Sequence, residues 1–131
     1  MAKGKVLVVD DEMDVRDVIR LQLEQKGLNV LEAVDGKDAI DIIRTGDNLV
    51  NVGLILCDIR MPKVNGVECI DYLKQEAPGI PIVVITGYPD TELATGLMKK
   101  GVKDYLVKPV EKEKLMAVVD TQIAAGKEIN F

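Results

Sequence analysis

Three acidic residues stand directly after two strongly apolar runs of the sequence. Asp10 and Asp11 follow Val6-Leu7-Val8-Val9, and Asp58 follows Leu54-Ile55-Leu56-Cys57. If both runs are parallel strands, they are too apolar to be half exposed, and their ends open into one crevice. At an effective dielectric constant near 20, two full charges about 4 Å apart repel by roughly 4 kcal/mol. A hard, oxygen-seeking divalent cation such as Mg²⁺ is the natural occupant of such a cluster.

The acidic residues also have simpler structural explanations. Acidic side chains favour the N-terminus of a helix, so Asp10, Asp11 or Glu12 could cap the helix that follows. One acid would suffice for capping, whereas three stand in a row here. Asp58 alone could be an ordinary turn residue. These alternatives stay open, although the shared crevice accounts for all the acids together.

Thr86 and Lys108 stand at strand ends and are candidates for the same crevice, and Tyr105 lies within the last predicted strand. Each of these residues also has a simpler structural explanation. Thr86 could serve merely to end its strand, and Tyr105 could be an ordinary half-buried aromatic. Lys108, which precedes Pro109, could lie in a solvated turn. Thr86 and Lys108, however, fall at the same ends of their strands as the acids. Open parallel sheets bind their ligands beyond the carboxyl ends of the strands. We therefore interpret the carboxylates, the hydroxyl group and the ammonium group as one site.

Composition narrows the class of protein. A chain of 131 residues has the size of one domain, and its net charge of −5 argues against a general binder of nucleic acid or anionic membranes. Cys57 and Cys69 form neither a disulfide framework nor a zinc pattern, and we expect Cys57 to be a reduced, packed thiol. No apolar stretch approaches the roughly 20 residues that span a bilayer, and the N-terminus does not resemble a signal peptide. We predict a soluble cytoplasmic protein.

Short apolar runs alternate with segments of helical periodicity along the whole chain. Strands are predicted at Lys5–Val9, Asn29–Ala33, Gly53–Cys57, Ile80–Ile85 and Val102–Val107. Helices are predicted over about 13–26, from 35 to near 46, after 65–66, from 89–90 to 101, and around 115–123 before a polar tail after Gly126. The residues expected to face the core from the first and fourth helices are Val15, Val18, Ile19, Leu23, Leu93, Ala94, Leu97 and Met98. This alternation predicts one α/β domain with a parallel sheet covered on both faces.

Four sequence blocks resemble the signature blocks of a known family. They are VVDDE at 8–12, CDIRMP at 57–62, VITG at 84–87 and DYLVKP at 104–109. In this order, to about Ile123, they resemble response-regulator receiver domains of the chemotaxis-regulator type. The resemblance implies a flavodoxin-like, doubly wound (βα)5 fold with a five-stranded parallel sheet in the order 2-1-3-4-5. Right-handed crossovers leave few other orders, although our choice of this one is not independent of the resemblance.

The resemblance also implies a function. Asp58 would accept a phosphoryl group from a histidine kinase or a His-containing phosphotransfer protein, with Lys108 and Thr86 as the other catalytic residues. Phosphoryl transfer depends mainly on positioning and on neutralising the equatorial oxygens, and Lys108 supplies a compact positive charge. The chain would then be a phosphoacceptor switch that catalyses its own phosphorylation and autodephosphorylation, and not an enzyme with a substrate of its own.

We expect Mg²⁺ as the cofactor. Asp11, Asp58 and the backbone carbonyl of Arg60 can hold the ion directly, with Asp10 acting through a water molecule. The side chains of Arg60 and Tyr88 flank the site, where they can screen or admit hydrolytic water. We predict that these two side chains set the lifetime of the phosphoryl group.

By analogy with the family, phosphorylation switches one face of the domain. The Thr86 hydroxyl group would turn to the phosphoryl group, Tyr105 would move inward, and the face of the fourth helix, fifth strand and fifth helix would change. Gly87 beside the site has no side chain and leaves room for the donor, and Pro109 is the other flanking residue. Many relatives carry an aromatic residue where this chain has Val110, which puts the packing of the last loop in doubt.

Three other classes of function are weighed against this one. A flavodoxin-like cofactor binder would have a hydroxyl- and glycine-rich phosphate loop after the first strand, whereas Asp10-Asp11-Glu12 would repel a phosphate. A metal-dependent phosphohydrolase that forms an aspartyl-phosphate usually carries a second acid two residues after the nucleophile, where this chain has Arg60 after Asp58. It also needs a lid domain, for which 131 residues leave no room. A receiver-shaped interaction module that is never phosphorylated would not need the complete set of Asp58, Thr86 and Lys108.

The output of the switch is the least defined part of the prediction. We assign residues 1–125 to the receiver domain and 126–131 to a C-terminal tail that is too short for an effector. The chain is either a stand-alone receiver that acts through protein contacts or, as we slightly favour, a piece of a longer regulator or hybrid kinase. We expect a monomer or a weak dimer that depends on phosphorylation, with no direct contact to nucleic acid or membrane.

Overall fold

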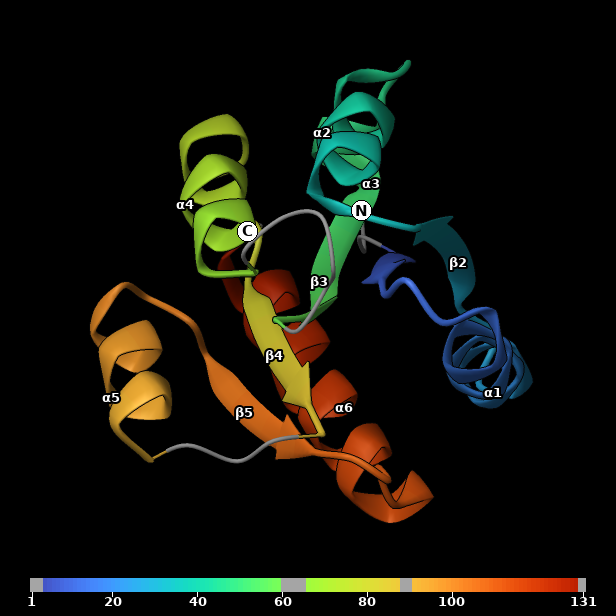
Figure 1. The fold of residues 1–131 in the computed structure, drawn as a ribbon. Helices are drawn as coiled ribbons and strands as arrows, with labels where there is room; N and C mark the ends of the chain where they lie inside the picture. Colours follow the sequence, from blue (N-terminus) through green and yellow to red (C-terminus); the bar gives the residue numbers. More distant parts are fainter. Residues whose placement is uncertain (1–3, 60–65, 88–90, 130–131) are drawn as a thin grey trace.

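The computed structural model describes residues 4–59, 66–87 and 91–129. Its sheet has five parallel strands in the order β2-β1-β3-β4-β5 (Figure 1). The strands are β1 (Lys5–Val9), β2 (Asn29–Ala33), β3 (Val52–Asp58), β4 (Ile82–Thr86) and β5 (Asp104–Val107). The predicted doubly wound sheet and its strand order are confirmed, so the carboxyl ends of all five strands meet at one edge.

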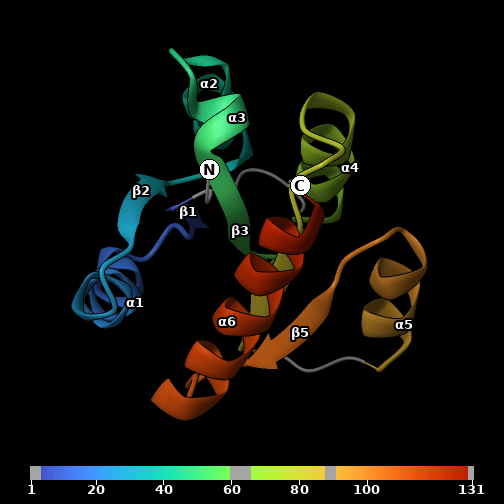
Figure 2. The same cartoon turned by 180° about the vertical axis from the view of Figure 1, so that it is seen from behind.

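Helices cover both faces of this sheet. The helices are α1 (Met13–Gln25), α2 (Gly36–Arg44), α3 (Asn48–Asn51), α4 (Gly66–Glu76), α5 (Thr91–Lys99) and α6 (Lys112–Ile129). Buried residues of α1 and α6 pack on one face, and those of α2, α4 and α5 pack on the other. Accordingly, α6 lies behind β4 and β5 in Figure 1 and in front of them in Figure 2.

The central strands are apolar because both of their faces are covered. On β1, Val6 and Val8 point to the layer of α1 and α6, whereas Leu7 and Val9 point to the layer of α2, α4 and α5. This alternation follows from the two-residue period of a strand. All four side chains are at most 1% exposed. The continuous apolar run before Asp10 is therefore the expected sequence of a strand buried on both sides.

The fourth strand begins later than the sequence predicted. We expected it at Ile80, but its ladder starts at Ile82. Pro81 has no N–H group to donate, although its carbonyl still accepts a hydrogen bond of 2.9 Å from the amide of Ile55.

The fifth strand is also shorter than predicted, for a different reason. Gly101 has a φ of +100°, and the amide of Val102 turns back to donate to the carbonyl of Leu97 at 3.1 Å. Val102 thus closes the end of α5 in a Schellman motif, and β5 begins only at Asp104. Gly27 ends α1 in the same way, as the sequence predicted.

Several smaller expectations about the helices are wrong. Val18 and Met98 were placed in the core but are 56% and 47% exposed. With 3.6 residues per turn, Val18 lies about 100° around α1 from buried Ile19, which takes it out of the packed face. The single-turn helix α3 was not predicted, and α6 continues past Gly126 to Ile129. Within the described ranges, no helix combines the length and apolar character needed to cross a membrane.

Candidate functional site

Three polar side chains are buried where neighbouring strands end. Asp58 is the last residue of β3, Thr86 is the last residue of β4, and Asp10 directly follows β1. Their exposed fractions are 3%, 0% and 2%, and no other polar or charged residue is buried in the part of the chain that the structure describes. Burying a charged group is costly unless a partner compensates it, so this edge of the sheet calls for a specific explanation.

The ammonium group of Lys108 provides the compensating charge. Its Nζ atom lies 2.9 Å from Oδ2 of Asp10 and 3.0 Å from Oδ2 of Asp58, with Oε1 of Glu12 at 4.0 Å. Burial lowers the pKa of Lys108, but the hydrogen bonds and charges of Asp10 and Asp58 outweigh it, so the pKa is raised. We expected a cation among these acids, and Lys108, a residue of the chain itself, supplies part of that positive charge.

Pairing between β4 and β5 places Lys108 in the site. Val107 is in register with Thr86, and the amide of Lys108 donates to the Thr86 carbonyl at 2.7 Å. Pro109 follows through a cis peptide bond. A Cβ atom on Gly87 would lie 3.9 Å from Cδ of Lys108, which is ordinary contact, so packing in the described structure does not demand a glycine there. The role predicted for Gly87, to leave room for the donor, stays a prediction.

Backbone contacts hold Asp10 in the site and argue against the capping alternative. Its amide donates to the carbonyl of Ala33 on β2 at 3.1 Å, and its Oδ1 accepts from the amide of Glu12 at 2.9 Å. Glu12 is the N-cap residue of α1, and its side chain makes no capping hydrogen bond. The turn between β1 and α1 therefore directs Asp10 toward Lys108, and the helix begins without a side-chain cap.

The acidic cluster suits a hard divalent cation. Carboxylate oxygens of Asp10, Asp11 and Glu12 all lie within 4.8 Å of one another, and Asp11 and Glu12 are exposed. Lys108 links this cluster to Asp58 through its two short contacts. An all-oxygen donor set that is open to solvent fits Mg²⁺, which keeps several waters and takes few protein ligands. Glu12 was considered only as a cap in the sequence, although its place in the acidic run is the signal that points to it.

Not every predicted site residue can be placed. Arg60 and Tyr88 lie outside the described residues, so the predicted carbonyl ligand and the two flanking side chains stay predictions. Tyr105 is half-buried on β5, in register with Val84, and packs against the core on the side of α2, α4 and α5. The cysteines are free and buried, and the Sγ atoms of Cys57 and Cys69 lie 3.8 Å apart.

An apolar groove begins at Lys108. It has a volume of about 370 Å³ and lies between α1 and the segment that follows β5. Its lining residues are Val15, Val18, Ile19, Gln22, Lys108, Pro109 and Val110. Sequence reasoning missed this groove, because it assigned Val18 to the core. The groove and the acidic cluster share Lys108, so they form adjoining parts of one surface.

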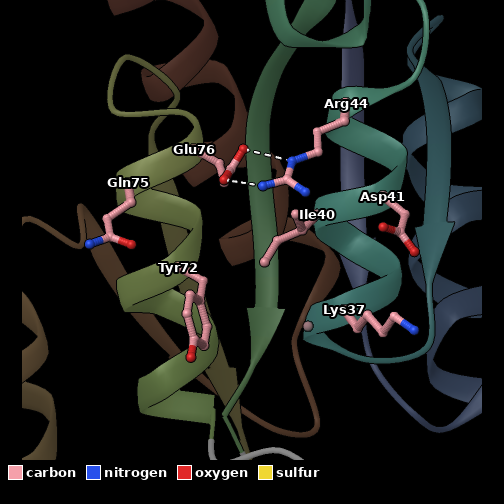
Figure 3. A pocket seen from close by; sticks show the side chains of 8 residues that line it. Lys37, Ile40, Asp41, Arg44, Tyr72, Gln75 and Glu76 are labelled. Atoms are coloured by element: carbon pink, nitrogen blue, oxygen red, sulfur yellow. Dashed lines mark hydrogen bonds and ion pairs between the residues drawn. The ribbon is translucent and has the colours of Figure 1, made fainter.

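A second pocket, of about 480 Å³, lies between α2 and α4 (Figure 3). The guanidinium group of Arg44 and the carboxylate of Glu76 form a bidentate ion pair between the two helices, and Ile40 is directed toward α4. None of its lining residues belongs to the acidic site. We therefore treat this pocket as a feature of helix packing.

Comparison with known proteins now identifies the family. A family model described as the response regulator receiver domain matches residues 6–120, which include every residue of the site. The chain belongs to this family. The resemblance seen in the four sequence blocks is thereby confirmed. Receiver domains of response regulators are switches in two-component signalling and not classical enzymes, and they generally bind Mg²⁺ in an acidic pocket.

Curated relatives of this receiver domain are longer proteins. The transcriptional regulatory protein ZraR of Salmonella typhimurium is 32% identical over 130 residues, which are 98% of this chain and 29% of ZraR. The transcriptional regulatory protein FixJ of Bradyrhizobium diazoefficiens is 31% identical over 121 residues, which are 92% of this chain and 57% of FixJ. The chain thus spans 29% of the length of ZraR and 57% of the length of FixJ. Receiver domains of this kind interact with histidine kinases and act through downstream effector domains.

Solved structures show the same fold. A receiver domain protein of Clostridium thermocellum superposes with a TM-score of 0.88 at 29% identity, covering 96% of this chain and 98% of that one. A receiver protein of Pseudomonas putida gives a TM-score of 0.84 at 31% identity, covering 92% of this chain and 98% of that one. Both agree with the strand order of the sheet, which is that of the flavodoxin-like fold.

Proposed function

We propose that Asp58 of this receiver domain accepts a phosphoryl group from a histidine kinase or a His-containing phosphotransfer protein. One observation carries the proposal: the buried Asp58 carboxylate lies 3.0 Å from Nζ of Lys108 at the open edge of the sheet. Asp10 contacts the same ammonium group, with its Oδ2 at 2.9 Å from Nζ. A carboxylate beside a fixed positive charge and an acidic cluster is a suitable acceptor for a charged phosphoryl group.

The residues of the chain account for most of the transfer chemistry. An oxygen of Asp58 forms a bond to phosphorus as the bond from phosphorus to the donor's imidazole nitrogen breaks, and the electron pair leaves with the imidazole. Because the transition state is loose, its charge lies mainly on the equatorial oxygens. Lys108 already contacts Asp58, so its ammonium group is within reach of an oxygen on the incoming phosphoryl group. Burial keeps the Asp58 carboxylate in one position for attack.

The acidic cluster would hold Mg²⁺ during this reaction. Asp11 and Asp58 would be direct ligands together with the carbonyl of Arg60, Asp10 would act through a water molecule, and Glu12 extends the cluster. When bound, Mg²⁺ supplies positive charge that neutralises oxygens of the phosphoryl group. Asp10 keeps its hydrogen bond from the Glu12 amide and its ion pair with Lys108, which fixes the side chain that faces the ion.

Phosphorylation would then switch one face of the domain. This face consists of α5, β5 and α6. The predicted fourth and fifth helices carry the labels α5 and α6 because the short helix α3 was not predicted. The Thr86 hydroxyl group would turn toward the phosphoryl group, and Tyr105 would move inward behind it. The half-buried position of Tyr105, one strand away from Thr86, supports this role. An effector in a longer protein, or a separate protein, would respond to the change.

The groove beside Lys108 is a suitable docking site for the protein that donates the phosphoryl group. It offers the apolar side chains of Val18 and Ile19 on α1 and of Val110 after β5, and Lys108, which contacts Asp58, is one of its lining residues. A donor helix that packs its apolar face there would bring its phosphohistidine to Asp58. We therefore assign this groove to the phosphohistidine-bearing partner.

The decisive experiment is phosphorylation by acetyl phosphate with and without Mg²⁺, followed by intact mass measurement. The wild-type chain should gain one phosphoryl group only with Mg²⁺, and Asp58→Ala should gain none. Asp71→Asn is a matched control, because Asp71 is an exposed carboxylate on α4 that pairs with Lys100. An adduct that survives in Asp58→Ala, or a wild-type chain that gains no adduct, would refute the assignment.

The same experiment separates the competing functions. A phosphohydrolase would also hydrolyse simple phosphate esters continuously, whereas a phosphoacceptor holds at most one phosphoryl group per chain and consumes acetyl phosphate only as fast as that group is formed and lost. A module that is never phosphorylated would show no adduct at all. The division into residues 1–125 and a tail, the cytoplasmic location and the monomeric or weakly dimeric state stay predictions.

A further inference from the structure

A largely buried arginine, Arg16, binds the backbone of the turn between β1 and α1 that carries Asp10 and Asp11. The side chain of Arg16 on α1 is 11% exposed, and its Nη1 donates to the backbone carbonyl of Asp10 at 2.6 Å. Its Nε donates to Oε1 of Glu32 at 3.2 Å. Glu32 lies on β2, where it is in register with Val8 of β1. One guanidinium group thus connects the first helix, the second strand and the carbonyl that joins Asp10 to Asp11.

With Arg16 in place, every polar group of Asp10 has a partner. The amide donates to Ala33, Oδ1 accepts from the Glu12 amide and Oδ2 contacts Lys108, so the carbonyl is the remaining group. The hydrogen bond from Arg16 fixes the orientation of the peptide unit between Asp10 and Asp11. That orientation determines where the Asp11 side chain leaves the backbone.

We propose that Arg16 is a positioning residue that sets the Mg²⁺ affinity of the acidic cluster without touching the ion or the phosphoryl group. The inference rests on the proposed function, because it concerns the ion that supports phosphorylation of Asp58. Groups that orient metal ligands from behind typically change metal affinity by about 10- to 100-fold when they are removed.

An arginine is needed at this position because two acceptors must be reached at once. The planar guanidinium group donates to a carbonyl with one nitrogen and to a carboxylate with another, which a single ammonium group cannot reproduce with the same geometry. Arg20, one turn further along α1, provides an internal comparison. Its Nη1 donates to Oε2 of Glu32 at 3.3 Å, and no contact between Arg20 and Asp10 is found among the described residues.

The direction in which Mg²⁺ affinity changes on removal of Arg16 distinguishes positioning from long-range electrostatics. Arg16 carries a positive charge close to an acidic cluster, so its removal should strengthen Mg²⁺ binding if long-range electrostatics dominated. The positioning role predicts the opposite result, which is weaker binding. Arg16→Lys keeps the positive charge but loses the planar group whose two nitrogens reach two acceptors. This variant should therefore also bind Mg²⁺ more weakly than the wild type.

The test is a Mg²⁺ titration of the full chain, followed by backbone amide NMR shifts, for wild type, Arg16→Met, Arg16→Lys and Arg20→Met. We expect the Kd for Mg²⁺ to rise about tenfold or more in both Arg16 variants. It should change less than twofold in Arg20→Met, which loses a contact to the same glutamate. Glu32→Gln, which keeps the shape of the acceptor, should give an intermediate shift and serves as a second variant if Arg16→Met does not fold.

Phosphorylation kinetics distinguish positioning from a loss of folded protein. With acetyl phosphate, the Mg²⁺ concentration for half-maximal rate should rise in Arg16→Met, while the rate at saturating Mg²⁺ stays within about threefold of wild type. Partial unfolding would lower the maximal rate and leave the half-saturation point unchanged. Equal Mg²⁺ affinities in the Arg16→Met and Arg20→Met chains would overturn the inference and leave the proposed function intact. A wild-type chain without Mg²⁺-dependent phosphorylation would instead overturn the proposed function.

Discussion

The Nζ atom of Lys108 lies 3.0 Å from Oδ2 of Asp58, although the two residues are 50 positions apart in the sequence. The same atom lies 2.9 Å from Oδ2 of Asp10. Lys108 therefore joins the ends of β1, β3 and β5 through charge, at an edge where two of the three side chains are almost fully buried. This arrangement serves stability and chemistry at once, and the two contributions can be measured separately.

Replacing Lys108 with methionine should both destabilise the fold and slow phosphorylation. The substitution leaves two buried carboxylates without their shared counter-ion, and removing one partner of a buried pair costs roughly 3–5 kcal/mol, less where the lost group is partly exposed. We expect the phosphorylation rate with acetyl phosphate to fall about 100-fold, as for the loss of a charge-stabilising donor. Urea denaturation and mass-resolved phosphorylation kinetics measure the two effects.

Two comparisons make the Lys108→Met result specific. Lys112→Met removes an exposed lysine at the start of α6 and should change neither property. Added Mg²⁺ should stabilise Lys108→Met more than the wild type, because the acids of the variant lack their internal cation. If Mg²⁺ stabilised both chains equally, the proposal that ion and lysine neutralise the same acids would be wrong.

The raised pKa of Lys108 predicts the alkaline behaviour of the domain. Its folded pKa lies above the ordinary value of 10.5, so the folded state binds this proton more tightly than the unfolded state does. Its contribution to stability is complete below that ordinary value and is lost as the pH rises through the folded pKa. The free energy of unfolding of the wild type, minus that of Lys108→Met, should be constant from pH 7 to about 10 and fall above it. A difference that grew with pH would contradict the assigned direction.

The strands were predictable from the apolar pattern, whereas the strand order was chosen partly on the resemblance to the family. Runs such as Val6 to Val9 are apolar at every position and are bounded by polar residues or glycine, which fits a strand covered on both faces. Helix ends at Gly27 and Gly101 were also readable, since both glycines adopt a positive φ. The same logic failed at Val102, because its amide closes the end of α5 with a hydrogen bond to the Leu97 carbonyl, five residues earlier, and β5 begins only at Asp104.

The placement of Asp10, Asp58, Thr86 and Lys108 at one edge of the sheet could be predicted, but their contacts could not. Glu12 was missed, and Arg60 and Tyr88 lie outside the described residues. Parallel strands bring Asp10, Asp58 and Thr86 to one edge of the sheet. The topology alone therefore predicts that these three residues lie close together. Nothing in the sequence indicates that Lys108 lies between the two aspartates, or that Arg16 binds the Asp10 carbonyl. Those contacts depend on side-chain geometry across three elements, which periodicity and spacing do not determine.

The switch proposed for Thr86 and Tyr105 can be observed with a fluorinated tyrosine. The chain has three tyrosines, so Tyr105→Phe assigns the ¹⁹F signal of Tyr105. Beryllofluoride with Mg²⁺, as a mimic of the phosphoryl group, should shift that signal in the wild type because the ring moves inward. In Thr86→Ala the mimic should still bind, but the shift should fall by more than half. If the shift were unchanged in Thr86→Ala, the movement of Tyr105 would not depend on the Thr86 hydroxyl group, and the proposed switch would be wrong.

Close contact between α2 and α4 predicts a sensitive glycine. A Cβ atom on Gly36 would lie 2.9 Å from Sγ and 3.1 Å from Cβ of Cys69. Gly36→Ala should therefore destabilise the domain by about 1–3 kcal/mol through overpacking, as measured by urea denaturation. The double variant Gly36→Ala with Cys69→Ala removes the sulfur and should recover part of the loss. Gly96→Ala on α5 is the control, because a Cβ atom there would meet no atom within 4 Å among the described residues.

The groove beside Lys108 allows donor docking to be separated from phosphoryl chemistry. Val18 is 56% exposed and lines the groove, so Val18→Asp should fold normally while placing a charge on the apolar seat. With acetyl phosphate, which needs no docking surface, the variant should be phosphorylated at the wild-type rate. With a purified histidine kinase that phosphorylates the wild type, transfer should slow by at least tenfold. Leu21→Asp adds the same charge at a position of α1 that is 54% exposed and does not line the groove, and it should transfer normally. Equal slowing in both variants would show that the partner responds to the charge of α1 in general, and equal rates in all three chains would place the donor elsewhere.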